Sequence, residues 1–227
     1  MLIGGLQKLT LIDFPGKVAC TLFTYGCNFR CPFCHNARLV DDEPELLDEE
    51  EFFSFLSKRK GLLDGVGITG GEPLLHKDMA SFIERIRSMG FAVKLDTNGS
   101  FPERLKEIVE RKLVDYVAMD VKNSKEKYAF SVGKEIDMDK IYESVDFLKS
   151  GAVPYEFRTT LVKGHHDEES MRSIGEWIKG TENYFLQNFV DSGHLLGQAE
   201  GLTKEETYRL LDVIREYIPT AKVRGLA

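Results

Sequence analysis

The chain has 227 residues, of which 42% are hydrophobic, and its formal net charge is −7. This length and hydrophobic content suffice for one sizeable core, so we expect a single domain over residues 1–227. Lys and Arg residues are spread along expected helices instead of being clustered, which argues against a nucleic-acid-binding surface. Because no apolar run approaches the roughly 20 residues of a membrane span and the first residues lack the features of a signal peptide, we expect a soluble, cytoplasmic protein that does not bind membranes.

Short apolar segments alternate with longer amphipathic segments along most of the chain. Alternation of this kind is typical of a parallel sheet, and right-handed crossovers would curl six such units into an open barrel. The predicted fold class is therefore α/β, an open partial (β/α)6 barrel. The expected strands are residues 18–24, 65–69, 91–95, 116–119, 155–162 and 183–189, and the expected helices begin at Asp48 and cover 77–89, 102–112, 139–149, 168–179 and 204–217.

Three of the four cysteines, Cys27, Cys31 and Cys34, fall in one short segment directly after the first expected strand. Soft thiolate ligands favour zinc, Cu(I) or iron–sulfur clusters. Closed zinc sites and ordinary electron-transfer clusters use four protein ligands, but Cys20 lies inside the expected strand and away from the loop. Three ligands would leave one iron of a cluster open to a small molecule, whereas His35 as a fourth ligand would complete a zinc site.

The spacing Cys27-x3-Cys31-x2-Cys34, with Phe33 before the last cysteine, resembles the signature of the radical S-adenosylmethionine (SAM) enzymes. Residues 31–36, preceded by Asp-Phe-Pro-Gly at 13–16, resemble the glycyl-radical-enzyme activases. The family most similar in these motifs is that of the anaerobic ribonucleoside-triphosphate reductase activating proteins, relatives of pyruvate formate-lyase activating enzyme. The resemblance implies a partial barrel of the radical SAM type, with one [4Fe–4S] cluster held by the three cysteines and SAM bound beside it.

Polar motifs follow several of the expected strands, where parallel α/β folds gather their chemistry. Gly70 and Gly71 can approach a ligand closely, although a plain turn would also use them. The resemblance assigns Gly70, Gly71 and Glu72 to the SAM amino group. It also directs further side chains at SAM, namely Phe33, His35, Asp120 and Lys122, and Arg158 is a further candidate from its place on the fifth expected strand.

Asp96, Thr97 and Asp120 match positions that line a monovalent-cation site beside the SAM carboxylate in the formate-lyase activases. A cation is electrostatically sensible where two carboxylates meet a third, although turn formation and helix capping are the simpler roles for these residues. Arg158 would place charge inside a barrel, which is costly unless the charge is paired or directed at a ligand. The neighbouring His165 and His166 are expected to be a solvated pair and not a second metal site.

The resemblance implies reductive cleavage of SAM to a 5′-deoxyadenosyl radical, which generates a glycyl radical on a partner enzyme. Anaerobic ribonucleotide reductase is the expected partner, and flavodoxin or ferredoxin is the expected one-electron donor. No side chain of the chain is expected to act as a catalytic acid or base. The alternatives are an activase of another glycyl radical enzyme of the formate-lyase type, a radical SAM enzyme acting on a small molecule such as a deazaguanine precursor, and a zinc-binding module.

Overall fold

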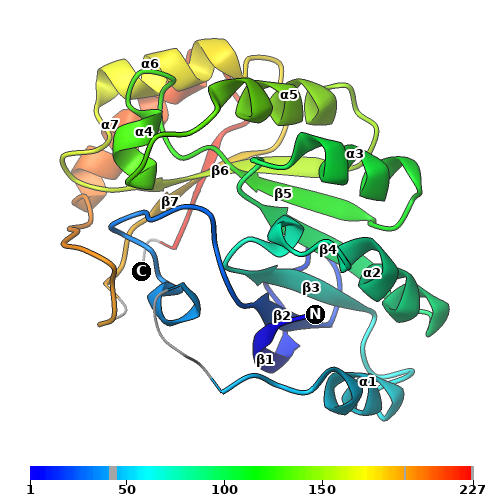
Figure 1. The fold of residues 1–227 in the computed structure, drawn as a ribbon. Coiled ribbons are helices and arrows are strands. Elements are labelled where there is room, and N and C mark those ends of the chain that lie inside the picture. Colours follow the sequence, from blue (N-terminus) through cyan, green and yellow to red (C-terminus); the bar gives the residue numbers. More distant parts are fainter. Residues whose placement is uncertain (41–44, 192, 226–227) are drawn as a thin grey trace.

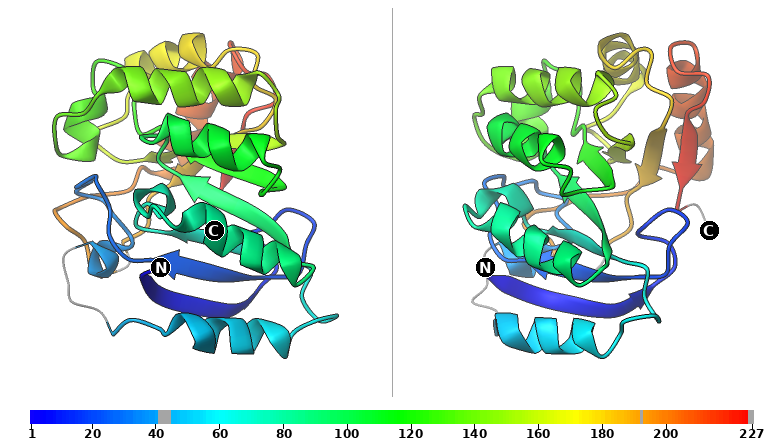
Figure 2. Two further views of the ribbon diagram at one scale, coloured as in Figure 1. Left: turned by 45° about the vertical axis from the view of Figure 1, so that its right-hand side comes forward. Right: turned by 90° about the vertical axis from the view of Figure 1, so that its right-hand side faces the viewer.

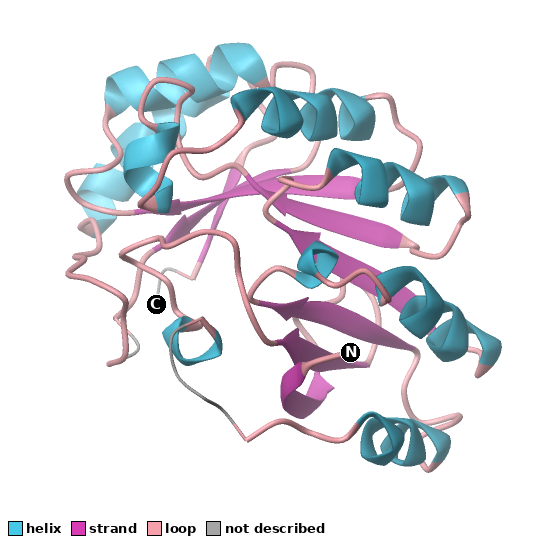
Figure 3. Cartoon of the chain, in the orientation of Figure 1, coloured by secondary structure: helices cyan, strands magenta, loops and turns pink. Residues whose placement is uncertain are grey.

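The computed structural model describes residues 1–40, 45–191 and 193–225 as one curved sheet with helices along its outer side (Figures 1 and 3). The strands follow one another in chain order, and all neighbours are parallel except β1 and β2. In the described residues, the strand order ends at β1 and β8 without pairing them, so the sheet is open. The strands are β1 (Ile3–Thr10), β2 (Ala19–Thr24), β3 (Gly65–Gly70), β4 (Ala92–Thr97), β5 (Tyr116–Asp120), β6 (Tyr155–Leu161), β7 (Tyr184–Asn188) and β8 (Lys222–Arg224).

Strands β2 to β7 are the six that the sequence predicts, and the α/β open-barrel fold is confirmed. The edge strands β1 and β8 and the short helix α4 were not expected. Figures 1 and 2 show α2, α3, α5 and α6 in chain order along the convex side of the sheet. The helices are α1 (Glu49–Ser57), α2 (Met79–Ser88), α3 (Pro102–Glu110), α4 (Tyr128–Val132), α5 (Met138–Lys149), α6 (Glu168–Trp177) and α7 (Lys204–Arg215), with short 3₁₀ turns η1 (Ala37–Leu39) and η2 (Pro73–Leu75).

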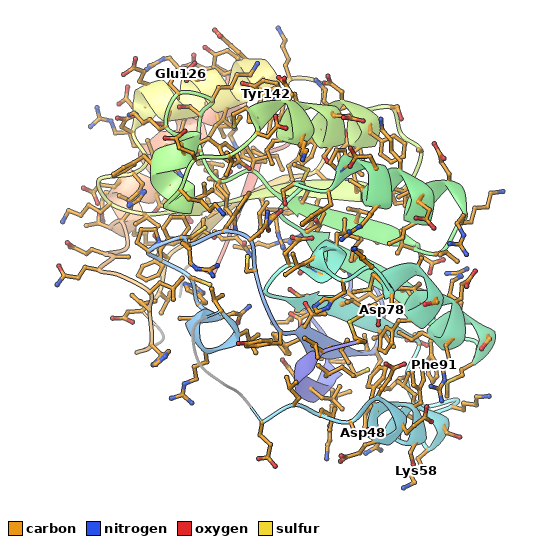
Figure 4. All side chains as sticks on the ribbon, in the orientation of Figure 1. Asp48, Lys58, Asp78, Phe91, Glu126 and Tyr142 are labelled. Carbon is orange, nitrogen blue, oxygen red and sulfur yellow. The ribbon has the colours of Figure 1, made fainter. Side chains whose placement is uncertain are left out.

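Helix α1 shows how the sequence sets these boundaries. The Asp48 carboxylate accepts hydrogen bonds from the backbone N–H groups of Glu50 and Glu51, so Asp48 caps the helix as predicted. Phe52 and Leu56 are four residues apart and both are fully buried. Figure 4 shows Asp48 and Lys58 at the two ends of this helix.

The two faces of the sheet differ in chemistry because successive strand residues point to opposite sides. In β6, Phe157, Thr159 and Leu161 are buried in the core beneath the helices, while Arg158 and Thr160 line a cavity on the concave side. In β4, Val93 and Leu95 are fully buried, while Lys94 and Asp96 line the same cavity. The helix-facing side is therefore apolar, and the interior of the barrel is polar.

A second charged group lies on the concave side around Glu156, whose residue is 1% exposed. Both carboxylate oxygens accept hydrogen bonds from the guanidinium of Arg224 on β8, at 2.7 and 2.9 Å. The Tyr116 hydroxyl donates a further hydrogen bond at 3.0 Å. The edge strand β8 thus supplies the counter-charge of a buried carboxylate on β6.

In the part of the chain that the structure describes, no helix is both long enough and apolar enough to cross a membrane.

Candidate active site

A cavity of about 410 Å³ lies on the concave side of the sheet and is lined mainly by residues at the carboxyl ends of its strands. Its wall joins segments from across the chain, from Gln7 on β1 to Gln187 on β7. Every residue that the sequence singles out as a ligand of a cluster, SAM or cation lies on this wall: Cys27, Phe33, Cys31, Cys34, His35, Gly70, Gly71, Glu72, Asp96, Thr97, Asp120, Lys122 and Arg158.

The cysteine loop leaves β2 and lies along the cavity. The backbone N–H of Phe29 donates a hydrogen bond to the Cys27 sulfur at 3.3 Å. Burial raises the pKa of the Cys27 thiol to about 12, and it raises the pKa of Cys31 to about 11 although Lys122 opposes it. Such thiols ionise only when an electropositive centre accepts the charge, as iron does.

The three thiols on the cavity wall are soft ligands of the kind that hold iron–sulfur clusters. Among the described residues, no three or more His, Cys, Asp or Glu side chains are arranged to hold a single metal ion. The fourth cysteine, Cys20, is fully buried in β2 and is absent from the cavity wall, and burial raises its thiol pKa to about 12. The His35 ring lies against Phe189, with 5.1 Å between ring centres, and burial lowers its pKa.

The Gly70-Gly71 pair holds the loop after β3 against the segment that leads into Cys27. A Cβ atom on Gly71 would lie 2.0 Å from the Gly26 carbonyl oxygen, and one on Gly70 would lie 2.3 Å from the Thr24 nitrogen. The φ of Gly70 is +119°, which favours glycine. The N–H of Gly71 donates to the Thr24 carbonyl at 2.9 Å. The glycines are thus required by the close approach of two backbones, whatever ligand lies beside them.

Glu72 is the most enclosed carboxylate on the cavity wall, with 0% of the residue exposed. It accepts hydrogen bonds from the Leu74 N–H at 3.0 Å, the Thr97 hydroxyl at 2.8 Å and the Asn98 N–H at 2.7 Å. Burial raises the Glu72 pKa to about 7, although these three donors favour the ionised form. A cationic group in the cavity would shift Glu72 towards the carboxylate.

Asp96 and Asp120 belong to a chain of ion pairs across β4, β5 and β6. One Asp96 oxygen pairs with Lys94, and the other lies 3.1 Å from Arg158. Arg158 also lies 3.0 Å from Asp120, whose second oxygen lies 2.9 Å from Lys122. Burial alone would raise the pKa of Asp120, but Arg158 and Lys122 outweigh it and hold that pKa well below its usual range. All four carboxylate oxygens are therefore engaged by protein cations.

Comparison with known proteins identifies the superfamily. Residues 21–174 match the radical SAM superfamily. The chain belongs to the radical SAM superfamily. A protein of Methanocaldococcus jannaschii named "Putative glycyl-radical enzyme activating enzyme" is 39% identical over 194 residues, which cover 83% of this chain and 80% of that protein. This similarity places the chain with the glycyl-radical activating enzymes of the superfamily, and the zinc-module alternative is wrong.

Two further relatives are more distant. A GTP 3′,8-cyclase of Campylobacter jejuni is 28% identical over 199 residues, which cover 83% of this chain but only 60% of the cyclase. A radical SAM methyltransferase structure from Sphaerobacter thermophilus superposes with a TM-score of 0.71 at 15% identity, covering 95% of this chain and 68% of that one. The structural similarity shows that the partial barrel is the radical SAM fold.

The expectation that His165 and His166 are solvated is wrong, because they are 9% and 5% exposed. The His166 Nδ1 accepts a hydrogen bond from the Val162 N–H at 3.0 Å, which leaves Nε2 protonated to donate to the Lys122 carbonyl at 2.9 Å. His165 stacks on Phe130, with 4.5 Å between ring centres. His166 therefore fixes the backbone that carries Lys122.

Sequence reasoning missed several polar residues in or beside this cavity. Lys94 is 3% exposed and lines the wall beside Asp96. Asn98 donates through its amide to Asn28 at 2.9 Å, which links the loop after β4 to the cysteine loop. The position of Asn98 directly after Asp96-Thr97 was an available signal, whereas Asn28 offered none beyond its place between two cysteines.

Proposed function

We propose that this chain is a radical SAM activase that generates a glycyl radical on a partner enzyme, and that the partner is an anaerobic ribonucleoside-triphosphate reductase. One observation carries the proposal. Three cysteines line a polar cavity at the carboxyl ends of an open sheet, and the fourth cysteine, Cys20, does not. The 39% identity to an activating enzyme supports the reaction class. The choice of reductase depends on the motif resemblance.

In this proposal Cys27, Cys31 and Cys34 hold a [4Fe–4S] cluster. When bound, the cluster and SAM supply the chemistry: one electron splits a carbon–sulfur bond of SAM into methionine and a 5′-deoxyadenosyl radical, which takes a hydrogen atom from a glycine of the partner. Glu72 receives the SAM amino group in its buried carboxylate pocket. Lys122 offers an ammonium to the SAM carboxylate. The remaining proposed SAM contacts are Phe33, His35, Gly70, Gly71, Asp120 and Arg158.

The open edge of the sheet between β1 and β8 supports a substrate that is a loop of another protein. A closed barrel would exclude such a loop. The electron would come from a small carrier such as flavodoxin or ferredoxin, and the proposed site of the reaction is the cytoplasm.

The test is anaerobic reconstitution with iron and sulfide, followed by reduction, addition of SAM, and incubation with an anaerobic ribonucleotide reductase. We expect 5′-deoxyadenosine and an EPR signal of a glycyl radical on the reductase. Cys27→Ala should abolish both products, whereas Cys20→Ala is the matched control and should retain them because Cys20 does not reach the cavity. A radical formed only on a formate-lyase-type partner would correct the choice of partner, and no 5′-deoxyadenosine with any partner would contradict the proposal.

A radical SAM reaction on a small molecule is the second candidate. The similarity to a GTP 3′,8-cyclase favours it, and a deazaguanine precursor is an example of such a substrate. Production of 5′-deoxyadenosine with such a compound, without a radical on any protein partner, would favour this candidate over the activase.

A further inference from the structure

The three residues expected to hold a monovalent cation have their oxygens engaged by groups of the protein itself. Both oxygens of Asp96 are paired, one with Lys94 and one with Arg158. Both oxygens of Asp120 are paired with Arg158 and Lys122. The Thr97 hydroxyl donates to Glu72 and accepts the Gly99 N–H at 3.1 Å. The donor set therefore does not fit a bound Na⁺ or K⁺.

The Lys94 and Arg158 side chains that pair with the Asp96 oxygens are largely buried, as Asp96 is. The side chains of Lys94 and Arg158 are only 4% and 14% exposed, and Asp96 between them is 17% exposed. Burying an ammonium is costly unless it has a close counter-charge, which Asp96 provides for Lys94. Unlike a free ion, the Lys94 ammonium is covalently attached to β4 and cannot leave the site. Lys94 lies two residues before Asp96 in β4, so both side chains point to the concave side.

The net charge of this chain of ion pairs also supplies the positive charge for which a monovalent cation was expected. Three protein cations face two carboxylates in the chain from Lys94 to Lys122. One positive charge is left over in this chain of ion pairs, and its three cations, Lys94, Arg158 and Lys122, all line the cavity. A third carboxylate arriving with SAM would meet an excess of positive charge without any metal ion.

We propose that Lys94, with Arg158, replaces the monovalent cation, so that this chain binds SAM without Na⁺ or K⁺. This inference rests on the proposed function, because it assumes that SAM binds in this cavity. Lys94 is then the residue that distinguishes this site from one that recruits an ion.

The experiment compares SAM affinity by titration calorimetry for the cluster-loaded protein in sodium, potassium and choline chloride at equal ionic strength. The wild-type Kd should differ less than about twofold among the three salts. Lys94→Met keeps most of the side-chain volume but removes the charge, and its Kd in choline chloride should be at least about tenfold weaker than in sodium or potassium chloride. Lys106→Met is the matched control, because Lys106 pairs with Glu143 on the surface at 2.6 Å.

A second readout needs no SAM. The melting temperature of Lys94→Met should rise when sodium or potassium replaces choline, whereas that of the wild type should stay the same. Lys94→Arg keeps the charge and should bind SAM equally well in all three salts, which leaves a test if Lys94→Met does not fold.

The outcomes separate this inference from the proposed function. Wild-type affinity that collapses in choline chloride overturns the inference and leaves the activase proposal in place. Salt-independent binding by both the wild type and Lys94→Met overturns the role of Lys94. Absence of SAM binding by the cluster-loaded wild type in every salt overturns both proposals.

Discussion

Replacing His166 by glutamine tests whether a buried neutral imidazole holds the loop that carries Lys122. His166 is 5% exposed, and burial lowers its pKa from 6.5 to about 4, against the opposing effect of its hydrogen bond to the Lys122 carbonyl. The unfolded chain therefore binds a proton more readily than the folded chain between about pH 6.5 and pH 4. Stability due to the neutral imidazole is fully present above this window and is lost as the pH falls through it.

The size of the effect follows from these two pKa values. Linkage gives a loss of about 2 kcal/mol at pH 5, against about 0.2 kcal/mol at pH 7, for one group with this shift. Glutamine does not titrate, so the variant lacks this loss. It also disturbs hydrogen bonds to the Val162 N–H and Lys122 carbonyl, which adds a pH-independent cost of about 1–3 kcal/mol for each group left unpaired.

The assay is equilibrium urea unfolding of the cluster-free chain, followed by fluorescence of its one tryptophan. That residue, Trp177, packs against Tyr142 with 5.4 Å between ring centres, so unfolding changes its surroundings. The quantity of interest is the difference between the wild type and His166→Gln at each pH, because titration of Glu72 and of the other groups cancels in it. We expect the wild-type advantage to shrink by about 2 kcal/mol between pH 7 and pH 5. A constant difference over this range would refute the assignment of a neutral buried histidine.

Three other substitutions test single contacts. Gly71→Ala places a Cβ against the Gly26 carbonyl. Differential scanning calorimetry should show a destabilisation of about 1–3 kcal/mol, and the cluster content should fall. Unchanged stability and cluster content would mean that the two loops move apart freely. Among the described residues, Arg224→Met leaves the Glu156 carboxylate with the Tyr116 hydroxyl as its hydrogen-bond donor. Chemical unfolding should show a loss of about 1–3 kcal/mol, below the full cost of a buried pair because the Arg224 side chain is 37% exposed, and no loss at all would refute the role of β8. Cys20→Ala should keep the wild-type iron-to-protein ratio, and a lower ratio would contradict the three-cysteine assignment.

The six central strands were predictable because most of them are short, nearly continuous apolar runs, as expected of a buried parallel sheet. Most helices were predictable because their apolar residues follow a period of 3.6, and the start of α1 because Asp48 caps it. The edge strand β1 was missed because its sequence contains Gly4 and Gly5, which weaken a strand signal. Strand β8 has three residues and α4 has five, too few to establish a period. The two edge strands form through pairing with a neighbour, β1 with β2 and β8 with β7.

The candidate site was likewise predictable only in part. The cysteine spacing and the polar motifs after the strands place every predicted site residue on one cavity wall, because strand ends of a parallel sheet converge. Lys94 could not be anticipated, since a lysine inside a short strand looks the same whether it faces solvent or the barrel. The burial of His165 and His166 depends on contacts with Phe130 and Lys122, which lie more than 30 positions away in the chain.

On the proposed function, the close contact between the two loops would also make iron loading and SAM recognition interdependent. Backbone hydrogen bonds join Thr24 and Gly26 to Gly71 and Glu72, and the Asn36 amide donates to the Gly70 carbonyl at 2.9 Å. Whatever orders residues 24–36 must also order residues 70–72, and by thermodynamic reciprocity the free energy of coupling is equal in the other direction. On the proposed function, a chain stripped of iron by air would release SAM as well, so an inactive molecule would not withhold SAM from enzymes that can use it.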